Sequence, residues 1–244
     1  IFATQTANAP TATHTPTITN TPFPTSTPRQ TFTLTPRATV APIAAEVVLT
    51  ATLQSGWILY ELQTSKFALA LPSEWKRLDL SPGGLENSLA VVGELNPNLK
   101  GVLSSQTLRN LITSGLRFYA VDLSPEALSG RCPVSMNVLK IDVGMTLPLD
   151  FLVSLTLEQL KNTADSAVPM THRRVTLSNI QAEEIKYGAK FATLTGDPLL
   201  VMVTQYVFID GTTEYAITLA SPREVSENYN PIFEQIAQSF RLLK

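Results

Sequence analysis

Residue types suited to nucleophilic or acid–base chemistry are scarce in this chain. It contains two histidines, His14 and His172, and one cysteine, Cys132. His14 lies in a Thr/Pro-rich segment that offers no packed site. His172 stands beside Arg173-Arg174, a setting more typical of a surface histidine in a basic turn than of a general base.

The single cysteine also carries little chemistry. Arg131 precedes Cys132 and could lower the pKa of its thiol, but no histidine lies near it in sequence. We therefore interpret Cys132 as an inert thiol. One cysteine also excludes an intrachain disulfide and any zinc site built from two or four thiolates.

Paired carboxylates are the remaining candidates for catalysis. Glu183-Glu184 would point to opposite faces of a strand and could not act together. The other acids considered occur singly in turns, caps or exposed strand positions: Asp142, Asp150, Asp210 and Glu214. No nucleophile elbow, zinc-binding helix, P-loop or dinucleotide fingerprint is present. We therefore predict no catalytic, cofactor-binding or metal-binding residue, and no effect of divalent metals or nucleotides on stability.

Basic residues do not indicate a nucleic-acid partner. Arg173-Arg174, Lys186 and Lys190 could form a small basic patch, but no aromatic platform accompanies them, so a solvated face is the simpler interpretation. The chain has 20 acidic and 18 basic residues, for a net charge of −2. This balance argues against binding to nucleic acid or to an anionic membrane.

The first 42 residues differ sharply from the rest. They contain 14 threonines and 7 prolines, with no acidic residue. Repeated prolines favour extended or polyproline II conformations and prevent a helix, so we predict a disordered or extended stalk over residues 1–42. Thr/Pro tracts of this kind resemble O-glycosylated stalks. The candidate glycosylation sites are four threonines that each directly precede a proline: Thr15, Thr21, Thr27 and Thr35.

The location expected for this chain follows from the stalk. No run of 18 or more apolar residues is present, so the visible chain should not span a membrane. We expect an extracytoplasmic protein, on the cell surface or secreted, that is anchored to a membrane only through an upstream segment not in this chain. Residues 43–55 are expected to be a transition into a single globular domain at 56–244.

Hydrophobic periodicity within that domain predicts alternating strands and helices. An early hairpin is expected at 57–62 and 67–71, and Gly115 should cap a helix. The further strands are predicted at 116–123, 134–143, 175–187, 200–209 and 212–220. The helices are predicted around 85–92, 108–112, 151–160 and 231–240. Hairpins imply a largely antiparallel sheet, and apolar helix faces must cover it, so the fold class is α+β.

Three local details can be tested against a structure. Asp210-Gly211 should form a type I′ turn with Ile209 opposite Thr212, which places Met202, Tyr206 and Phe208 on the core face with Tyr215, Ile217 and Leu219. Asp150 should cap a helix whose apolar stripe is Phe151, Leu152, Leu155 and Leu160. Asn230 should cap the last helix, with Pro231 at its first position and a stripe of Ile232, Phe233, Ile236, Ala237 and Phe240.

Two stretches of this domain resemble PsbP-like domains. Residues 67–75, Phe-Ala-Leu-Ala-Leu-Pro-Ser-Glu-Trp, are similar to the strand, Pro and Trp pattern with which those domains begin. Residues 215–219 lead through Ser221-Pro222 to a helix that ends in Ser239-Phe240, as in that family, and the helix at 151–160 falls where the family has its middle helix. The resemblance implies a central antiparallel β-sheet flanked by helices, a PsbP-like α/β/α sandwich.

The family includes the PsbP subunit of photosystem II, a Ran-binding nuclear import factor and exported bacterial lipoproteins. Two features depart from its pattern: residues 78–115 are long and helical, and neither histidine has a family role. No functional site therefore carries over from the resemblance.

The leading functional hypothesis is a non-enzymatic binding or accessory domain, held off the cell envelope by the stalk, with an unknown protein or cell-surface partner. The alternatives are an enzyme or enzyme inhibitor whose site is dispersed in sequence, or a photosynthetic accessory subunit. A large apolar pocket with converging polar groups would indicate a ligand site, whereas a filled core would leave only surface binding.

Overall fold

The computed structural model describes residues 46–53, 56–95, 104–128, 132–192 and 198–244, without the side chains of 191 and 192. The predicted stalk and its four candidate threonines, Thr15, Thr21, Thr27 and Thr35, lie outside the described residues, so those predictions stay open.

A seven-stranded sheet is the centre of the domain, with strand order β4-β5-β6-β10-β9-β8-β7. Every neighbouring pair is antiparallel. Its strands are β4 (Trp75–Arg77), β5 (Leu116–Asp122), β6 (Ser135–Asp142), β7 (Thr171–Leu177), β8 (Ile180–Ala192), β9 (Pro198–Asp210) and β10 (Thr213–Pro222).

A second, four-stranded antiparallel sheet has the order β1-β2-β3-β11. Its strands are β1 (Val48–Thr52), β2 (Trp57–Leu62), β3 (Phe67–Pro72) and β11 (Arg241–Leu242). The β2–β3 pair is the hairpin expected from the sequence. β1 lies within residues 43–55 and contributes an edge strand to this sheet.

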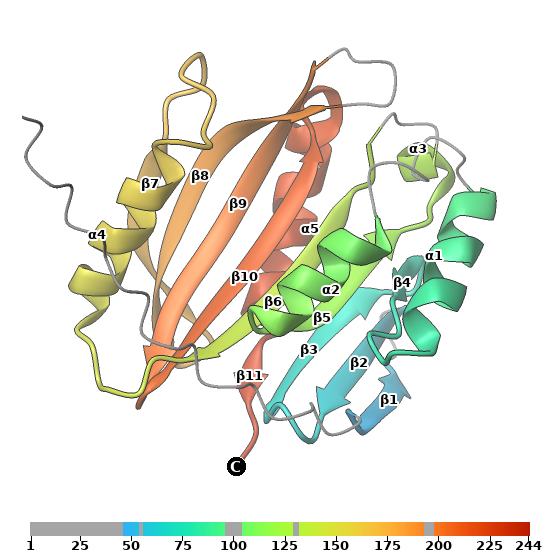
Figure 1. The fold of residues 1–244 in the computed structure, drawn as a ribbon, viewed down its shortest axis with the longest axis horizontal. Coiled ribbons are helices and arrows are strands. Elements are labelled where there is room, and N and C mark those ends of the chain that lie inside the picture. Colours follow the sequence, from blue (N-terminus) through green and yellow to red (C-terminus); the bar gives the residue numbers. More distant parts are fainter. Residues whose placement is uncertain (1–45, 54–55, 96–103, 129–131, 193–197) are drawn as a thin grey trace, which may run out of the picture. The chain divides into compact units, whose positions relative to one another are not determined.

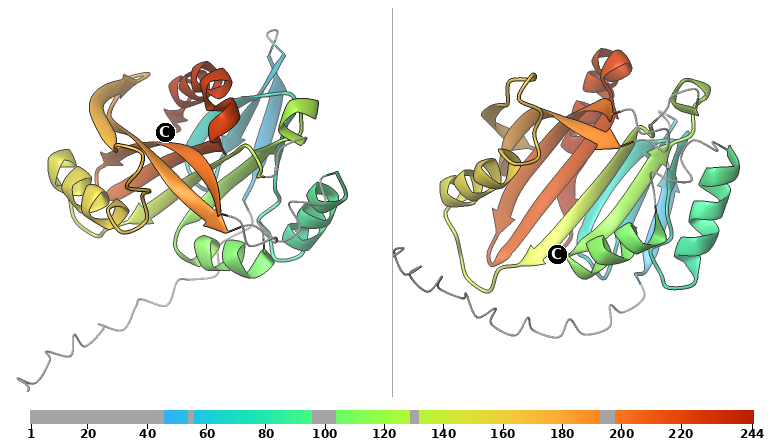
Figure 2. Two further views of the ribbon diagram at one scale, coloured as in Figure 1. Left: turned by 90° about the horizontal axis from the view of Figure 1, so that it is seen from above. Right: turned by 45° about the horizontal axis from the view of Figure 1, so that its top comes forward.

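Helices cover both faces of the larger sheet (Figures 1 and 2). They are α1 (Gly84–Leu95), α2 (Ser105–Thr113), α3 (Pro125–Leu128), α4 (Leu149–Leu160) and α5 (Ser226–Gln238), with a short 3-10 turn at Arg223–Val225. α5 and the smaller sheet pack on one face, whereas α1, α2 and α4 pack on the other. The predicted class, α+β with an antiparallel sheet flanked by helices, is confirmed. The second sheet was not foreseen.

The main core lies on the α5 face. Phe233 and Phe240 are 3% and 0% exposed and share one apolar cluster with Tyr206 and Ile217. The Phe240 ring contacts the rings of Phe67, Phe208 and Tyr215 at centroid distances of 5.3, 5.3 and 6.0 Å. The last helix is therefore docked against the sheet as its apolar stripe predicts.

The register of the β9–β10 hairpin differs from the prediction. Asp210 pairs with Thr213, and Ile209 pairs with Glu214, so the turn residues are Gly211 and Thr212. Gly211 has a φ of 61°, and glycine at the first turn position is the pattern of a type II′ turn. Each β9 residue therefore pairs with a β10 residue two positions later than predicted. A shift of two positions leaves every side chain on the predicted face of the sheet. Met202 is the exception to the predicted core set, since it is only half-buried.

The single strand expected at 175–187 is wrong. β7 and β8 form a hairpin that reverses at Ser178 and Asn179. Ser178 has a φ of 50°, a conformation that small polar residues visit in tight turns. The Ser-Asn pair was the available signal for this turn.

The predicted start and stripe of α4 also need correction. The helix begins at Leu149, no side chain caps it, and Asp150 instead accepts a hydrogen bond from Arg174. Phe151 and Leu155 are 52% and 44% exposed. The residues that α4 buries are Leu152, Val153 and Thr156, because the helix is rotated relative to the predicted orientation.

The start of α5 lies earlier than predicted. The helix begins at Ser226, so Asn230 is not its cap and Pro231 lies inside it. Proline has no N–H, which removes one backbone hydrogen bond of the helix. Tyr229 offsets this loss, because it is buried and its hydroxyl donates to the Asp122 Oδ2 atom at 2.6 Å.

Gly115 ends α2 in the predicted manner and makes a stability prediction. Its φ is +114°, and a Cβ atom there would lie 2.7 Å from the Lys140 carbonyl oxygen. We expect Gly115→Ala to lower the free energy of unfolding by about 1–3 kcal/mol, because strain adds to this clash. Gly83→Ala is the control, since no atom lies within 4 Å of a Cβ at that position. Equal urea midpoints for the two variants would contradict the prediction.

Candidate functional site

A cavity of about 390 Å³ lies on the sheet face that carries α2 and α4. Residues of both the apolar cluster around α1 and α2 and the cluster around α4 line it, and Figure 1 shows strands β8, β9 and β10 between α2 and α4. α2 bounds the cavity through Leu108 and Leu111, and Thr163, just after α4, lines it at the other end. Strands β5, β6, β8, β9 and β10 supply its floor.

The part of the floor that β8 and β9 form is mainly apolar. Val203 pairs with Tyr187 on β8 and with Ala220 on β10, so these three side chains form one row across the sheet. Val201 and Ala189 pair in the next row on the same face. Apart from Tyr187, the side chains of both rows are small or β-branched, and they leave space that no helix fills.

The part of the floor that β5, β6 and β10 form includes a polar row. Tyr119, Asn137 and Thr218 form one row of register partners. The hydroxyl of Tyr119 hydrogen-bonds with Ser135. Asn137 and Thr218 are half-buried, and neither side chain has a hydrogen-bond partner among the described residues. These two side chains are therefore able to bond a molecule in the cavity.

The cavity interior is uncharged at neutral pH. Burial raises the pKa of Tyr119 and of Tyr187 to about 12 and that of Cys132 to about 11. Lys190 is the one charged side chain among the described lining residues. Its Nζ atom lies 3.2 Å from the Asp165 Oδ2 atom, and its side chain is 61% exposed. The charge is thus paired and lies at the rim.

The buried thiol yields a pH-dependent prediction. With its pKa at about 11, Cys132 should carry roughly a hundredfold less thiolate at pH 8 than in the unfolded chain. We expect native alkylation by iodoacetamide, followed by intact mass, to be at least a hundredfold slower than in denaturant. The native rate should still rise between pH 9 and pH 10.5. A rate that levels off by pH 9 would contradict this prediction.

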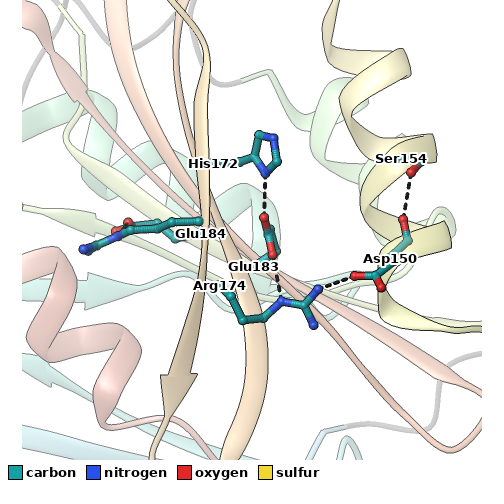
Figure 3. A network of polar contacts seen from close by, with 7 residues as sticks. Asp150, Ser154, His172, Arg174, Glu183 and Glu184 are labelled. Carbon is teal, nitrogen blue, oxygen red and sulfur yellow. Dashed lines mark hydrogen bonds and ion pairs between the residues drawn. The ribbon is translucent and has the colours of Figure 1, made fainter.

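His172 belongs to a polar network between β7, β8 and α4, outside the cavity (Figure 3). Its Nδ1 atom lies 2.6 Å from Oε1 of Glu183, which is 5% exposed. Arg174 donates to the second Glu183 oxygen at 3.0 Å and also to Asp150 on α4. Together these contacts join β7, β8 and α4, which is a structural role.

Glu184 lies on the opposite face, toward α5. It accepts a hydrogen bond from Tyr206 at 3.1 Å and ion-pairs with Arg173 and Lys186. Burial alone would raise its pKa, but these two cations outweigh that effect and hold the pKa below its usual range. Glu184 and Lys186 also line a smaller cavity of about 260 Å³ beside α5. All four cations of the proposed basic patch are paired with carboxylates.

The structure keeps the candidate nucleophile and the candidate base of the sequence apart. Cys132 contributes to the cavity wall and His172 is bonded elsewhere, so the structure does not bring the two together as a nucleophile and its base. Within the part of the chain that the structure describes, no group of three or more His, Cys, Asp or Glu side chains could hold a metal ion.

Sequence reasoning missed the cavity residues, including Asn137, Thr218 and Val203. The only sequence signal for these residues is the pair of polar side chains at strand positions that face inward. The alternation of apolar and polar residues along a strand does not reveal the cavity, because it does not tell which sheet face a helix leaves uncovered.

No family model and no curated protein matches this chain. Among solved structures, it is similar to a cyanobacterial PsbP from Synechocystis, with a TM-score of 0.43 and 10% identity over 77% of this chain and 92% of that one. It is also similar to LpqN from Mycobacterium tuberculosis, a protein involved in cell envelope biogenesis, with a TM-score of 0.44 and 11% identity over 73% and 83% of the two chains. The residues of this chain therefore have to carry any functional assignment.

None of the helices in the described ranges has the length and hydropathy needed to cross a bilayer.

Proposed function

We propose that this chain is a non-enzymatic, extracytoplasmic binding or accessory domain whose ligand occupies the cavity beside α2. The observation that supports this function is the cavity itself, about 390 Å³ in volume and lined mainly by apolar side chains. Ligand sites commonly have volumes of about 300–1,000 Å³ and combine apolar walls with a few polar groups. Asn137 and Thr218 are such groups here.

The Thr/Pro composition of residues 1–42 supports the extracytoplasmic part of the proposal. A segment of this kind would act as a stalk that holds the domain off the envelope, joined upstream to an anchor not in this chain. The partner there would be a protein or another cell-surface component. Intact-mass measurement on native material tests the stalk: unmodified threonines at Thr15, Thr21, Thr27 and Thr35 would contradict the predicted glycosylation.

Binding can be tested with N-phenyl-1-naphthylamine, an uncharged dye that fluoresces in apolar surroundings. We expect saturable binding with one site per chain. Ala189→Leu should weaken binding at least tenfold, because the larger side chain would project into the apolar half of the cavity. Ala51→Leu is the matched control, since Ala51 lies exposed on β1.

Equal dye affinity in wild type, Ala189→Leu and Ala51→Leu would overturn the assignment of the cavity as the site. Thermal unfolding of all three proteins checks that each is folded.

A further inference from the structure

The shape of the cavity restricts what it can hold. It crosses five neighbouring strands, β5, β6, β10, β9 and β8. At about 4.8 Å per strand, the four intervals span roughly 19 Å. Dividing the volume of about 390 Å³ by this length leaves a mean cross-section of about 20 Å². A single extended hydrocarbon chain has a similar cross-section.

The cavity also has two chemically different halves. Val201, Val203 and Ala189 line the half under β8 and β9, whereas Tyr119, Asn137 and Thr218 line the half toward α2. A ligand matched to this surface is apolar at one end and hydrogen-bonding at the other.

The polar half selects against two kinds of ligand. A pure hydrocarbon would cover Asn137 and Thr218 and leave their polar atoms without partners, which opposes binding. An ionic head group would be buried where the described lining residues offer no charge, since Lys190 lies in the other half and is paired with Asp165. Burying an unpaired charge is strongly unfavourable.

We propose that the cavity binds a single-chain amphiphile with an uncharged head group. The head, an ester, amide or hydroxyl group, bonds the amide of Asn137 and the hydroxyl of Thr218, and the chain lies over Val203 and Val201 toward Ala189. This inference rests on the proposed function and specifies its ligand class.

The length of the apolar half sets the chain length. From β10 to β8 there are two strand intervals, about 10 Å. An extended chain advances roughly 1.2 Å per bond, so about eight carbons fill this half. Longer chains should place their ends outside it, where additional carbons gain little.

Titration calorimetry with 1-monoacylglycerols below their micelle concentrations tests the proposal. From six to about eight acyl carbons, each added methylene should lower the Kd about fourfold, and the gain should then level off. The fatty-acid anion of the same length should bind at least tenfold more weakly, because its charge has no partner. A carboxylate that binds as tightly as the monoacylglycerol would overturn the uncharged-head assignment.

Thr218→Val tests the head-group contact with nearly the same side-chain shape. It should weaken binding of the eight-carbon monoacylglycerol about two- to tenfold. Thr50→Val, on the exposed surface of β1, is the control and should leave this affinity unchanged.

The outcomes separate this inference from the proposed function. If no monoacylglycerol binds while dye binding remains sensitive to Ala189→Leu, the cavity is still a ligand site and the amphiphile assignment is wrong. Equal affinity for six- and eight-carbon chains would likewise overturn it.

Discussion

Phe233→Ala is expected to lower the free energy of unfolding by about 3–5 kcal/mol. Phe233 is 3% exposed; its ring packs edge-on against Trp75 at 6.4 Å and in a tilted arrangement against Tyr229 at 5.8 Å between ring centroids. Removing the ring reduces the apolar surface buried in the core and leaves a cavity between α5 and the sheet. The cavity can close only if α5 and the sheet move closer to each other. Urea unfolding followed by circular dichroism measures the difference.

Phe151→Ala is the matched control for that variant. Phe151 also lies on a helix and was predicted to be part of an apolar stripe, but it is 52% exposed on α4. Its truncation should change the free energy of unfolding by less than about 1 kcal/mol, because little burial is lost. Comparable losses in the two variants would show that α5 is not docked as described.

Phe240→Ala is expected to be as damaging, about 3–5 kcal/mol, and to act at a different place. Phe240 is fully buried and contacts Phe67 of the smaller sheet together with Phe208 and Tyr215 of the larger one. Its ring therefore joins the two sheets. Hydrogen exchange should become faster in β2 and β3 before it changes in β8 and β9.

Two results would contradict this account of Phe240. One is an unchanged urea midpoint. The other is accelerated exchange spread evenly over both sheets, which would mean that the ring contributes burial but does not specifically hold the smaller sheet.

Elements with a strong local signal could be predicted from the sequence. The hairpin at 57–72, the helix that ends at Gly115 and the face of Tyr206, Phe208 and Tyr215 all follow from period, turn residues and alternation, which act over a few neighbouring residues. The predicted register of the β9–β10 hairpin and the predicted caps of α4 and α5 were wrong, because Gly211, Asp150 and Asn230 are each compatible locally with both the predicted position and the observed one. In the structure, pairing with Glu214, the contact with Arg174 and the burial of Tyr229 chose between them.

The amino-acid sequence by itself determined the α+β class, the antiparallel pairing and the absence of any local catalytic motif, since all three depend on residue type and short-range spacing. Only the tertiary structure decided which face of each strand became core, ion-pair network or cavity. Asn137, Thr218 and Val203 are ordinary alternating strand residues in the chain. They form one surface because β10 pairs with β9 on one side and with β6, far away in sequence, on the other, and because α2 and α4 leave the space above them unfilled. That vacancy is a property of long-range packing, which no short-range pattern encodes.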